Sequence, residues 1–459
     1  MDNREYIDLI VNKQKAFFNL NSTKDIYFRI EQLDKLKNII LEYEDLIIDS
    51  LYKDLGKSPF ESYSTEIGMV LSEISHAQKN IKNWSKVKKV KTPITNFKAK
   101  SYIYPEPYGN VLIISPWNYP LQLTLAPLLG AIAAGNTALI KPSSSSLHTS
   151  NTIEKMINEN FPEEFIHVIN MDSKSADYLL DKKFDYIFYT GSVSVGKLIM
   201  GKASKHLTPI TLELGGKSPC IVDKEGDIDI FAKRIVWGKF LNAGQTCVAP
   251  DYVYVHKDIK DKLIENIVKY IEYFYGKNIK DNDEYPRIIN KKQFNRLISL
   301  IDENKLIYGG DSDLESLYIS PTIMDNITWD DPVMEDEIFG PILPLLEYES
   351  IVQVIEEIKK RPRPLALYVF STNPKVVTKV INSLSFGGGC INDTVMHLAN
   401  PHMPFGGIGN SGMGAYHGEY SFHTFTHYKS ILDKSLSPDV DTRYPPYKGK
   451  LKWVKKFMK

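Results

Sequence analysis

The sequence predicts an α/β protein whose main sheet is parallel and doubly wound. From residue 109 onward, short apolar runs alternate with longer segments of helical character, as in βαβ units. Polar or glycine-rich segments follow several of these runs, at the edge where an open parallel sheet binds ligands. The chain has 459 residues, which is long for one hydrophobic core, so two or three domains are expected.

Two helices are predicted before the sheet. The first starts at residues 21–23, carries apolar residues every three or four positions over 30–51, and stops at Gly56. The second runs over about 61–84 with one apolar face. The next segment, 86–104, is basic and mixes aromatic with polar side chains, which favours a hairpin outside the main core.

Buried parallel strands follow. They are predicted at 110–114, 137–140, 166–169 and 186–189. A helix over 121–134, closed by Gly135, connects the first two. The stretch 107–140 carries no charge, but prolines interrupt it, so we expect a buried core segment and no membrane span.

Composition excludes some classes of function. The 56 basic and 56 acidic residues give a net charge of +0, which offers no general attraction to nucleic acid. The three cysteines are too few for a disulfide framework, and the first residues do not resemble a signal peptide, so a cytoplasmic location is expected. The ten histidines have no metal-ligand spacing, so no metal is predicted.

Cys247 is the candidate nucleophile. It follows a glycine turn, and a thiolate there can attack a carbonyl carbon. Glu213 lies between two leucines, where burial would raise its pKa towards use as a general base. The alternatives are an inert buried cysteine and a paired structural carboxylate. Cys220 and Cys390 lie in predicted strands and are expected to be inert.

Asn118 and two segments near it are candidate binding groups. The Asn118 amide can donate to an oxyanion, or it can cap the following helix. Residues 190–196 follow a strand and open a helix, a place that suits a pyrophosphate, although the spacing is not the usual dinucleotide fingerprint and a plain turn is the alternative. Lys141 can reach a ribose hydroxyl or phosphate, or be a solvated lysine.

In combination these segments resemble the aldehyde dehydrogenase superfamily. The resemblance covers about 51–429 and rests on residues 116–120, 212–217, 240–250 and 337–341. Further segments resemble the class 3 branch, whose members act on fatty and aromatic aldehydes. They are residues 246–252, 404–414 and 416–418, together with a short N-terminus.

The resemblance implies a reaction and a cofactor. Cys247 would attack the aldehyde to give a thiohemiacetal, the Asn118 amide and the Cys247 N–H would hold its oxyanion, and Glu213 would activate water to hydrolyse the later thioester. The cofactor would be NAD or NADP. The residues expected beside it are Trp117, Lys141, Gly191, Ser192, Gly196, Glu337 and Phe339.

The resemblance also implies three parts and a homodimer. These would be a Rossmann-like cofactor domain, an α/β catalytic domain, and a small β arm that pairs across the dimer and includes a strand near 422–430. The expected bounds are 1–85 and 105–210 for the NAD(P)-binding domain, 211–395 for the catalytic domain, 86–104 and 415–435 for the arm, and 436–459 for a basic tail.

Ser144 departs from the family pattern. The family commonly has Lys-Pro-Ser-Glu, whereas this chain has Lys141-Pro142-Ser143-Ser144. The serine removes a carboxylate that would repel a 2′-phosphate. We therefore expect Ser144 to lie beside the cofactor and NADP to be accepted alongside NAD.

The predicted activity is the oxidation of medium- and long-chain aldehydes, polyene and aromatic ones included, to carboxylic acids. A coenzyme A-acylating enzyme is the near alternative, and a catalytically silent binding or structural relative is the distant one.

The basic, partly apolar end at 448–459 can touch anionic lipid at the membrane periphery, or it can pack against the protein or remain solvated. It lacks the stacking platform of a nucleic-acid module.

Overall fold

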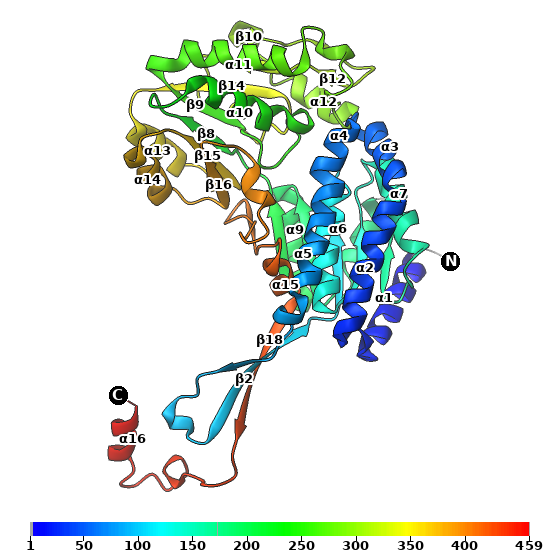
Figure 1. The fold of residues 1–459 in the computed structure, drawn as a ribbon, viewed down its shortest axis with the longest axis vertical. Coiled ribbons are helices and arrows are strands. Elements are labelled where there is room, and N and C mark those ends of the chain that lie inside the picture. Colours follow the sequence, from blue (N-terminus) through cyan, green and yellow to red (C-terminus); the bar gives the residue numbers. More distant parts are fainter. Residues whose placement is uncertain (1–2, 172, 459) are drawn as a thin grey trace.

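Two α/β bodies and a projecting arm make up the protein (Figure 1). The computed structural model describes residues 3–171 and 173–458. Each body is a mainly parallel sheet with helices on its faces, and the arm is a thin antiparallel sheet. The predicted fold class is confirmed. The N-terminus lies beside the first body, and the C-terminus lies beside the far end of the arm.

The sheet of the first body has the order β17-β7-β6-β3-β4-β5. Its strands are β3 (Asn110–Ile114), β4 (Thr137–Lys141), β5 (Ile166–Val168), β6 (Tyr186–Gly191), β7 (Ile210–Leu214) and β17 (Gly412–Met413). All pairs are parallel except β17 with β7. The four strands predicted from their apolar runs are confirmed, because a strand covered on both faces needs an unbroken apolar run.

In the described residues, ten α-helices belong to this first body. They are α1 (Asn3–Asn19), α2 (Ile26–Glu42), α3 (Glu44–Leu55), α4 (Pro59–Ser62), α5 (Gly68–Trp84), α6 (Gln122–Ala134), α7 (Leu147–Asn158), α8 (Ser173–Leu180), α9 (Val193–Ala203) and α15 (Glu419–Thr424). Every residue of α6 is buried. The uncharged stretch is therefore a core segment, as predicted, and none of the helices in the described residues is long and apolar enough to cross a membrane.

The first of the predicted helices needs two corrections. The apolar pattern over 30–51 belongs to α2 and α3, because Tyr43 leaves helical geometry between them with φ −93° and ψ 7°. The first of these helices begins later than predicted, where the Asp25 carboxylate accepts hydrogen bonds from the N–H groups of Tyr27 and Phe28. The helix predicted over 61–84 is confirmed, but it contains a π-helical turn at Tyr63–Ile67.

The sheet of the second body has the order β10-β13-β14-β9-β8-β15-β16. Its strands are β8 (Pro219–Val222), β9 (Tyr252–His256), β10 (Leu306–Tyr308), β13 (Thr322–Met324), β14 (Ile342–Tyr348), β15 (Ala366–Phe370) and β16 (Gly388–Ile391). A separate hairpin pairs β11 (Ser312–Asp313) with β12 (Tyr318–Ile319). The helices are α10 (Ile228–Phe240), α11 (Lys260–Tyr275), α12 (Lys291–Ile298), α13 (Ile351–Lys359) and α14 (Pro374–Ser383).

Cys220 and Cys390 lie in strands of this second sheet, as predicted. Cys220 is fully buried in β8. Cys390 differs from the expectation of a buried thiol, because β16 is the edge strand and leaves it half-buried.

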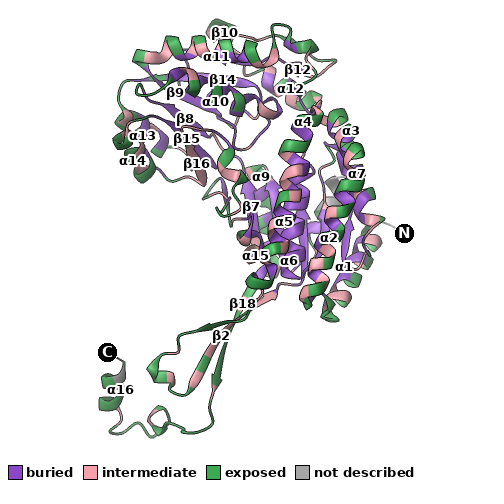
Figure 2. Ribbon diagram, in the orientation of Figure 1, coloured by how far each residue is buried: buried purple, intermediate pink, exposed green. Residues whose placement is uncertain are grey.

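The arm consists of β1 (Lys88–Val90), β2 (Ala99–Pro107) and β18 (Thr426–Lys434), in the order β1-β2-β18 and antiparallel throughout. Its outer strands β1 and β18 are mostly exposed, whereas the central strand β2 is mostly half-buried (Figure 2). The predicted hairpin is confirmed. The strand expected from about 422 starts at Thr426 instead, because Phe422 is a buried residue of α15, which packs against α6.

The division between the bodies falls after β7. The expected bounds put residues 211–214 in the catalytic domain, but β7 pairs in parallel with β6 and so belongs to the first sheet. β8 starts the second sheet at Pro219. The short segment 215–218 therefore connects the bodies. Beyond the arm, the tail forms α16 (Leu451–Phe457), and Lys459 lies outside the described residues.

Candidate active site

A cavity of about 940 Å³ receives residues from both bodies. Eight of the eleven predicted site residues line it: Trp117, Asn118, Gly191, Ser192, Glu213, Cys247, Glu337 and Phe339. Lys141, Ser144 and Gly196 do not line it. The segments that line the cavity run in sequence from Pro116 to Asn410. The predicted residues among them come from the ends of β3, β6 and β7 and from two loops of the second body.

A tight turn before β9 places Cys247. Asn242 and Ala243 have left-handed φ angles of 52° and 50°, which are uncommon for residues with a side chain. Gly244 also has a positive φ, 73°, and a Cβ there would lie 2.2 Å from the Gly340 carbonyl oxygen. Only glycine fits such an approach. The glycine recognised in the sequence thus lets the thiol-bearing loop pass the 337–341 segment.

The surroundings of Cys247 disfavour the thiolate in this resting state. Burial raises the pKa of the thiol, and the nearby Glu337 and Glu213 carboxylates raise it further. The backbone N–H groups of Cys247 and Val248 oppose this rise by donating to the sulfur. The causes that raise this pKa outweigh those that lower it. The thiol must therefore lose its proton before it attacks.

Glu213 lies near the end of β7 with both carboxylate oxygens unpartnered. Among the described residues neither oxygen has a hydrogen-bond partner, and the side chain is 2% exposed. Burial raises the pKa of this carboxyl well above its usual value. A buried carboxyl without a partner is costly, which favours a group that serves chemistry over the alternative of a paired structural carboxylate.

Asn118 is held by both its main chain and its side chain. Its carbonyl oxygen accepts from Lys57 Nζ at 3.1 Å and from Asn242 Nδ2 at 2.7 Å. Its own Nδ2 donates to the Gln245 carbonyl oxygen at 3.0 Å. An amide nitrogen carries two hydrogens. One of them remains for a ligand in the cavity, so the geometry favours a donor role over helix capping.

Glu337, Phe339 and Trp117 form one wall of the cavity. The rings of Trp117 and Phe339 meet edge to face with centroids 5.3 Å apart. Burial, and next the Asp251 charge, raise the pKa of Glu337 to about 8. A Cβ on Gly215 would lie 1.9 Å from Glu337 Oε2, so a larger residue there would displace this carboxylate. The wall offers flat apolar surface beside a hydrogen-bonding acid, which suits a nicotinamide ring and its ribose.

The N-terminus of α9 forms another wall. Ser192 caps the helix by accepting from the Val195 N–H, and Lys197 of the first turns also lines the cavity. Backbone N–H groups and a lysine at a helix start suit a pyrophosphate. Gly191 and Gly196 pack closely against neighbouring side chains: a Cβ would lie 2.3 Å from Tyr189 Oη in the first case and 2.7 Å from Leu214 Cδ2 in the second, so a larger residue would displace them.

Lys141 and Ser144 lie at the same edge of the sheet but outside the cavity lining. Lys141 ends β4, directly beside Ile114 of β3, and its Nζ donates to the Pro142 carbonyl oxygen at 3.2 Å. Burial lowers the pKa of Lys141. Ser144 is exposed in the turn before α7. Their roles towards a cofactor stay predictions.

Some lining residues were missed by the sequence reasoning. They are cationic: Lys197, Lys217, Arg296, Lys360, Arg361 and Arg363. Arg361 and Arg363 alternate with prolines just before β15, at the amino-terminal edge of the second sheet, a signal that the sequence does carry. Arg296 gave none, because it comes from a short amphipathic helix. This charge suits a dinucleotide with its phosphates.

Comparison with known proteins identifies the family. The family model described as "Aldehyde dehydrogenase family" matches residues 1–431. The chain belongs to the aldehyde dehydrogenase family. Its resemblance to the class 3 branch fits the same comparisons, since relatives named as family 3 members align over nearly its whole length.

Three similar proteins show how far the aldehyde dehydrogenase likeness extends. The "4,4'-diaponeurosporen-aldehyde dehydrogenase" of Staphylococcus aureus (strain NCTC 8325 / PS 47) is 53% identical over 97% of both chains. The "Aldehyde dehydrogenase, dimeric NADP-preferring" of Mus musculus is 44% identical over 97% of this chain and 99% of its own. A solved structure of Staphylococcus aureus AldH in a substrate-bound state has a TM-score of 0.97, with 52% identity and 99% of each chain covered.

Proposed function

We propose that this chain oxidises medium- and long-chain aldehydes to carboxylic acids with NAD or NADP. The observation that carries the proposal is the convergence of Cys247, Glu213 and Asn118 on one cavity, beside the α9 N-terminus, in a member of the aldehyde dehydrogenase family. Polyene and aromatic aldehydes are included in the class. The relative at 53% identity is named for such a polyene aldehyde.

The reaction begins at Cys247. Its sulfur loses the proton and adds to the aldehyde carbon, so that a C–S bond forms and the carbonyl π electrons pass to oxygen. The free hydrogen of the Asn118 amide and the Cys247 N–H stabilise the resulting oxyanion. Glu337 and Glu213 are the two carboxylates that act electrostatically on the thiol, and they are the groups available to receive its proton.

Oxidation then leaves an acyl group on sulfur. The thiohemiacetal on Cys247 would lose a hydride from its carbon while its oxyanion electrons re-form the carbonyl. NAD or NADP, when bound, would supply the hydride acceptor for this oxidation. The residues that would hold it are Trp117, Glu337 and Phe339 at the ring and ribose, and Gly191, Ser192 and Lys197 at the phosphates. The Cys247 thioester remains.

Hydrolysis releases the acid. Ionised Glu213 takes a proton from water, the water oxygen adds to the thioester carbon, and the Cys247 thiolate leaves. An unpartnered buried carboxyl in the cavity favours this step over transfer to coenzyme A, since a hydrolytic base would waste the acyl thioester. The presence of all three groups also counts against a catalytically silent relative.

The arm and tail carry proposals about assembly and location. We propose a homodimer in which the exposed arm pairs across two chains by strand addition, which agrees with a relative named as dimeric.

We propose a cytoplasmic protein that can contact membranes through the basic tail, whose helix α16 is exposed. Vesicles of phosphatidylserine should retain the protein, and deletion of 449–459 should remove that retention; equal retention by both forms would end the lipid proposal.

The test of the activity is reduced-nicotinamide formation from aldehydes of increasing chain length, with NAD and with NADP. Turnover by the wild type that is lost in Cys247→Ala supports the proposal. No turnover until coenzyme A is added would favour the acylating alternative, and none in either case would favour the silent one.

A further inference from the structure

A buried lysine lies behind the candidate oxyanion donor. Lys57 follows α3 and has no exposed surface, which is rare for a lysine. Gly56 makes the turn that sends it inward, with a left-handed φ of 62° at the end of α3. Nothing in the reaction described above uses this side chain.

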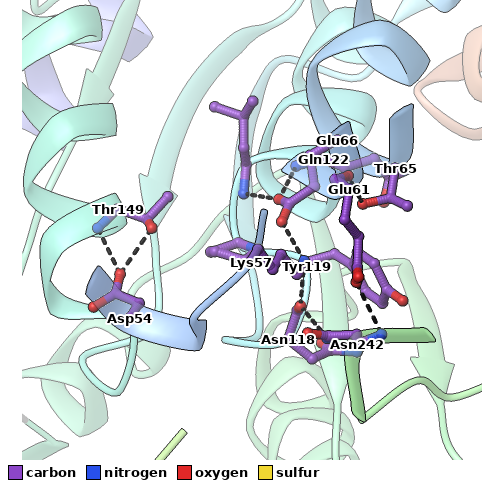
Figure 3. Close-up of polar contacts among 12 residues, drawn as sticks. Asp54, Lys57, Glu61, Thr65, Glu66, Asn118, Tyr119, Gln122, Thr149 and Asn242 are labelled. Carbon is purple, nitrogen blue, oxygen red and sulfur yellow. Dashed lines mark hydrogen bonds and ion pairs between the residues drawn. The ribbon is translucent and has the colours of Figure 1, made fainter. Parts of the chain in front are cut away.

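The lysine forms an ion pair with an equally buried carboxylate. Lys57 Nζ lies 2.6 Å from Glu66 Oε1, and both side chains are fully buried (Figure 3). Glu66 lies in the π-helical turn Tyr63–Ile67, a deviation often found at functional sites. A buried pair recovers its desolvation cost only if the remaining donors and acceptors are satisfied, so the other contacts of the pair matter.

Those contacts lead to the Asn118 loop. Glu66 Oε2 accepts from the N–H groups of Leu121 at 2.8 Å and Gln122 at 3.2 Å, where α6 begins. A carboxylate is stabilised at a helix N-terminus. Lys57 Nζ donates to the Asn118 carbonyl oxygen at 3.1 Å and lies 4.0 Å from the centre of the Tyr119 ring. The pair thus contacts the loop at Asn118 and at the start of α6.

The same cluster reaches the loop of Cys247. Asn242 Nδ2 donates to the Asn118 carbonyl oxygen, and the Asn242 N–H donates to Glu61 Oε1 at 2.8 Å (Figure 3). Tyr119 Oη lies 2.7 Å from Thr246 Oγ1. Two loops from different bodies are therefore fixed to each other next to the buried Lys57–Glu66 ion pair.

We infer that Lys57, held by Glu66, is a positioning residue that fixes the Asn118 main chain so that the side-chain amide can meet the oxyanion formed on Cys247. The inference rests on the proposed function for its reaction. It does not make Lys57 catalytic, because Lys57 Nζ contacts the main chain and the Tyr119 ring and does not line the cavity.

The test compares Lys57→Met/Glu66→Gln with the wild type, with Asn118→Ala, and with the variant that combines all three changes. The paired change removes both buried charges together, which avoids leaving one of them alone. Lys53→Met is the matched control, because Lys53 forms an exposed ion pair on α3. Circular dichroism and dinucleotide affinity verify that each variant is folded.

Two reactions are measured. One is aldehyde oxidation. The other is hydrolysis of 4-nitrophenyl acetate without dinucleotide, which needs addition to a carbonyl and an oxyanion donor but no hydride transfer. Loss of ester hydrolysis in Cys247→Ala, measured in parallel, ties that probe to the same thiol.

We expect Lys57→Met/Glu66→Gln to lose about 10- to 100-fold in kcat for both reactions, with KM changed little. In the Asn118→Ala background the same paired change should cost no more than about twofold, because the group that it positions is gone. Lys57→Gln/Glu66→Gln, which keeps an uncharged donor for the Asn118 carbonyl and leaves no buried charge alone, should retain more of the kcat than Lys57→Met/Glu66→Gln.

The inference is overturned if the paired variant stays within about twofold of the wild type, or if its loss is equally large with and without Asn118. If the folded wild type hydrolyses the ester through Cys247 but oxidises no aldehyde, the proposed function is wrong, but the inference about Lys57 is not affected. The ester rates would then still decide whether Lys57 acts through Asn118.

Discussion

Asn118 Nδ2 donates a hydrogen bond of 3.0 Å to the carbonyl oxygen of Gln245, two residues before Cys247. The candidate oxyanion donor and the candidate nucleophile are thus fixed to each other, although they come from different bodies of the protein. A donor that is already in place costs no reorganisation when negative charge develops. This contact explains why the site needs the two bodies in a defined relative position.

Replacing Asn118 should remove one of two oxyanion donors. Asn118→Ala is expected to lower kcat by about 100- to 1000-fold. The dinucleotide affinity should change little, since Trp117 and Glu337 stay in place. Steady-state kinetics with a saturating dinucleotide measures the loss. A kcat within about threefold of the wild type would show that the Cys247 N–H is sufficient alone.

Replacing Glu213 should separate oxidation from hydrolysis. Glu213→Gln leaves Cys247 able to attack and to become acylated, but removes the base that activates water. We expect a burst of one reduced nicotinamide per chain, followed by slow turnover, and a mass increase equal to the acyl group on the peptide that contains Cys247. Steady turnover at the wild-type rate without a burst would contradict this role.

The reactivity of Cys247 should increase with pH. Because burial, Glu337 and Glu213 raise the pKa of the thiol, the thiolate fraction is small at neutral pH and grows as the pH rises. Alkylation by iodoacetamide should therefore accelerate through about pH 7 to 10. Glu337→Gln removes a facing negative charge and should shift this curve to lower pH.

The measurement is made in a Cys390→Ala background, because Cys390 is half-buried whereas Cys220 is fully buried. An alkylation rate that does not depend on pH over this range would contradict the raised pKa of Cys247.

Ser144 should influence the choice between NADP and NAD. Ser144→Glu is expected to lower kcat/KM with NADP about tenfold relative to NAD, since a carboxylate near a 2′-phosphate is repelled. Because Ser144 is exposed, we expect the substitution to change the cofactor preference without destabilising the fold. Ser145→Glu, one position along the same exposed turn, is the control. An unchanged NADP to NAD ratio would show that Ser144 lies too far from the phosphate.

The arm should control the oligomeric state. Ile431 and Leu432 are exposed apolar residues of β18, the outer strand of the arm. Replacing both with glutamate should shift the mass measured by light scattering from two chains to one, because charges on an unpaired strand oppose strand addition. A wild type that is monomeric at the same concentration would contradict the proposed dimer.

The sequence predicted the parts of the fold that depend on local patterns. The strand at 110–114 followed from an unbroken apolar run, which a strand covered on both faces needs. The helix predicted over 121–134 followed from an uncharged, largely apolar segment closed by Gly135. The break at Tyr43 could not be predicted, because the apolar spacing continues across it. Nor could the end of β7 be assigned to the first sheet, since that depends on its pairing with β6.

The candidate site could be predicted where the type of a residue indicates its chemical role. Cys247, Glu213 and Asn118 are a nucleophile, an acid and an amide in distinctive surroundings, and the structure brings them to one cavity. Lys57 gave no signal, because a lysine between two helices is normally solvated. Its burial arises only when the Asn118 loop and the π-helical turn pack around it, which is a property of the tertiary structure.

The most direct test of the proposed activity is the rate of reduced-nicotinamide formation from a long-chain aldehyde by the wild type and by Cys247→Ala, measured side by side at equal dinucleotide saturation. The thiol mechanism predicts sustained turnover by the wild type and none above background by the variant, with dinucleotide affinity retained. Equal turnover by both proteins would contradict the assignment of Cys247 as the nucleophile.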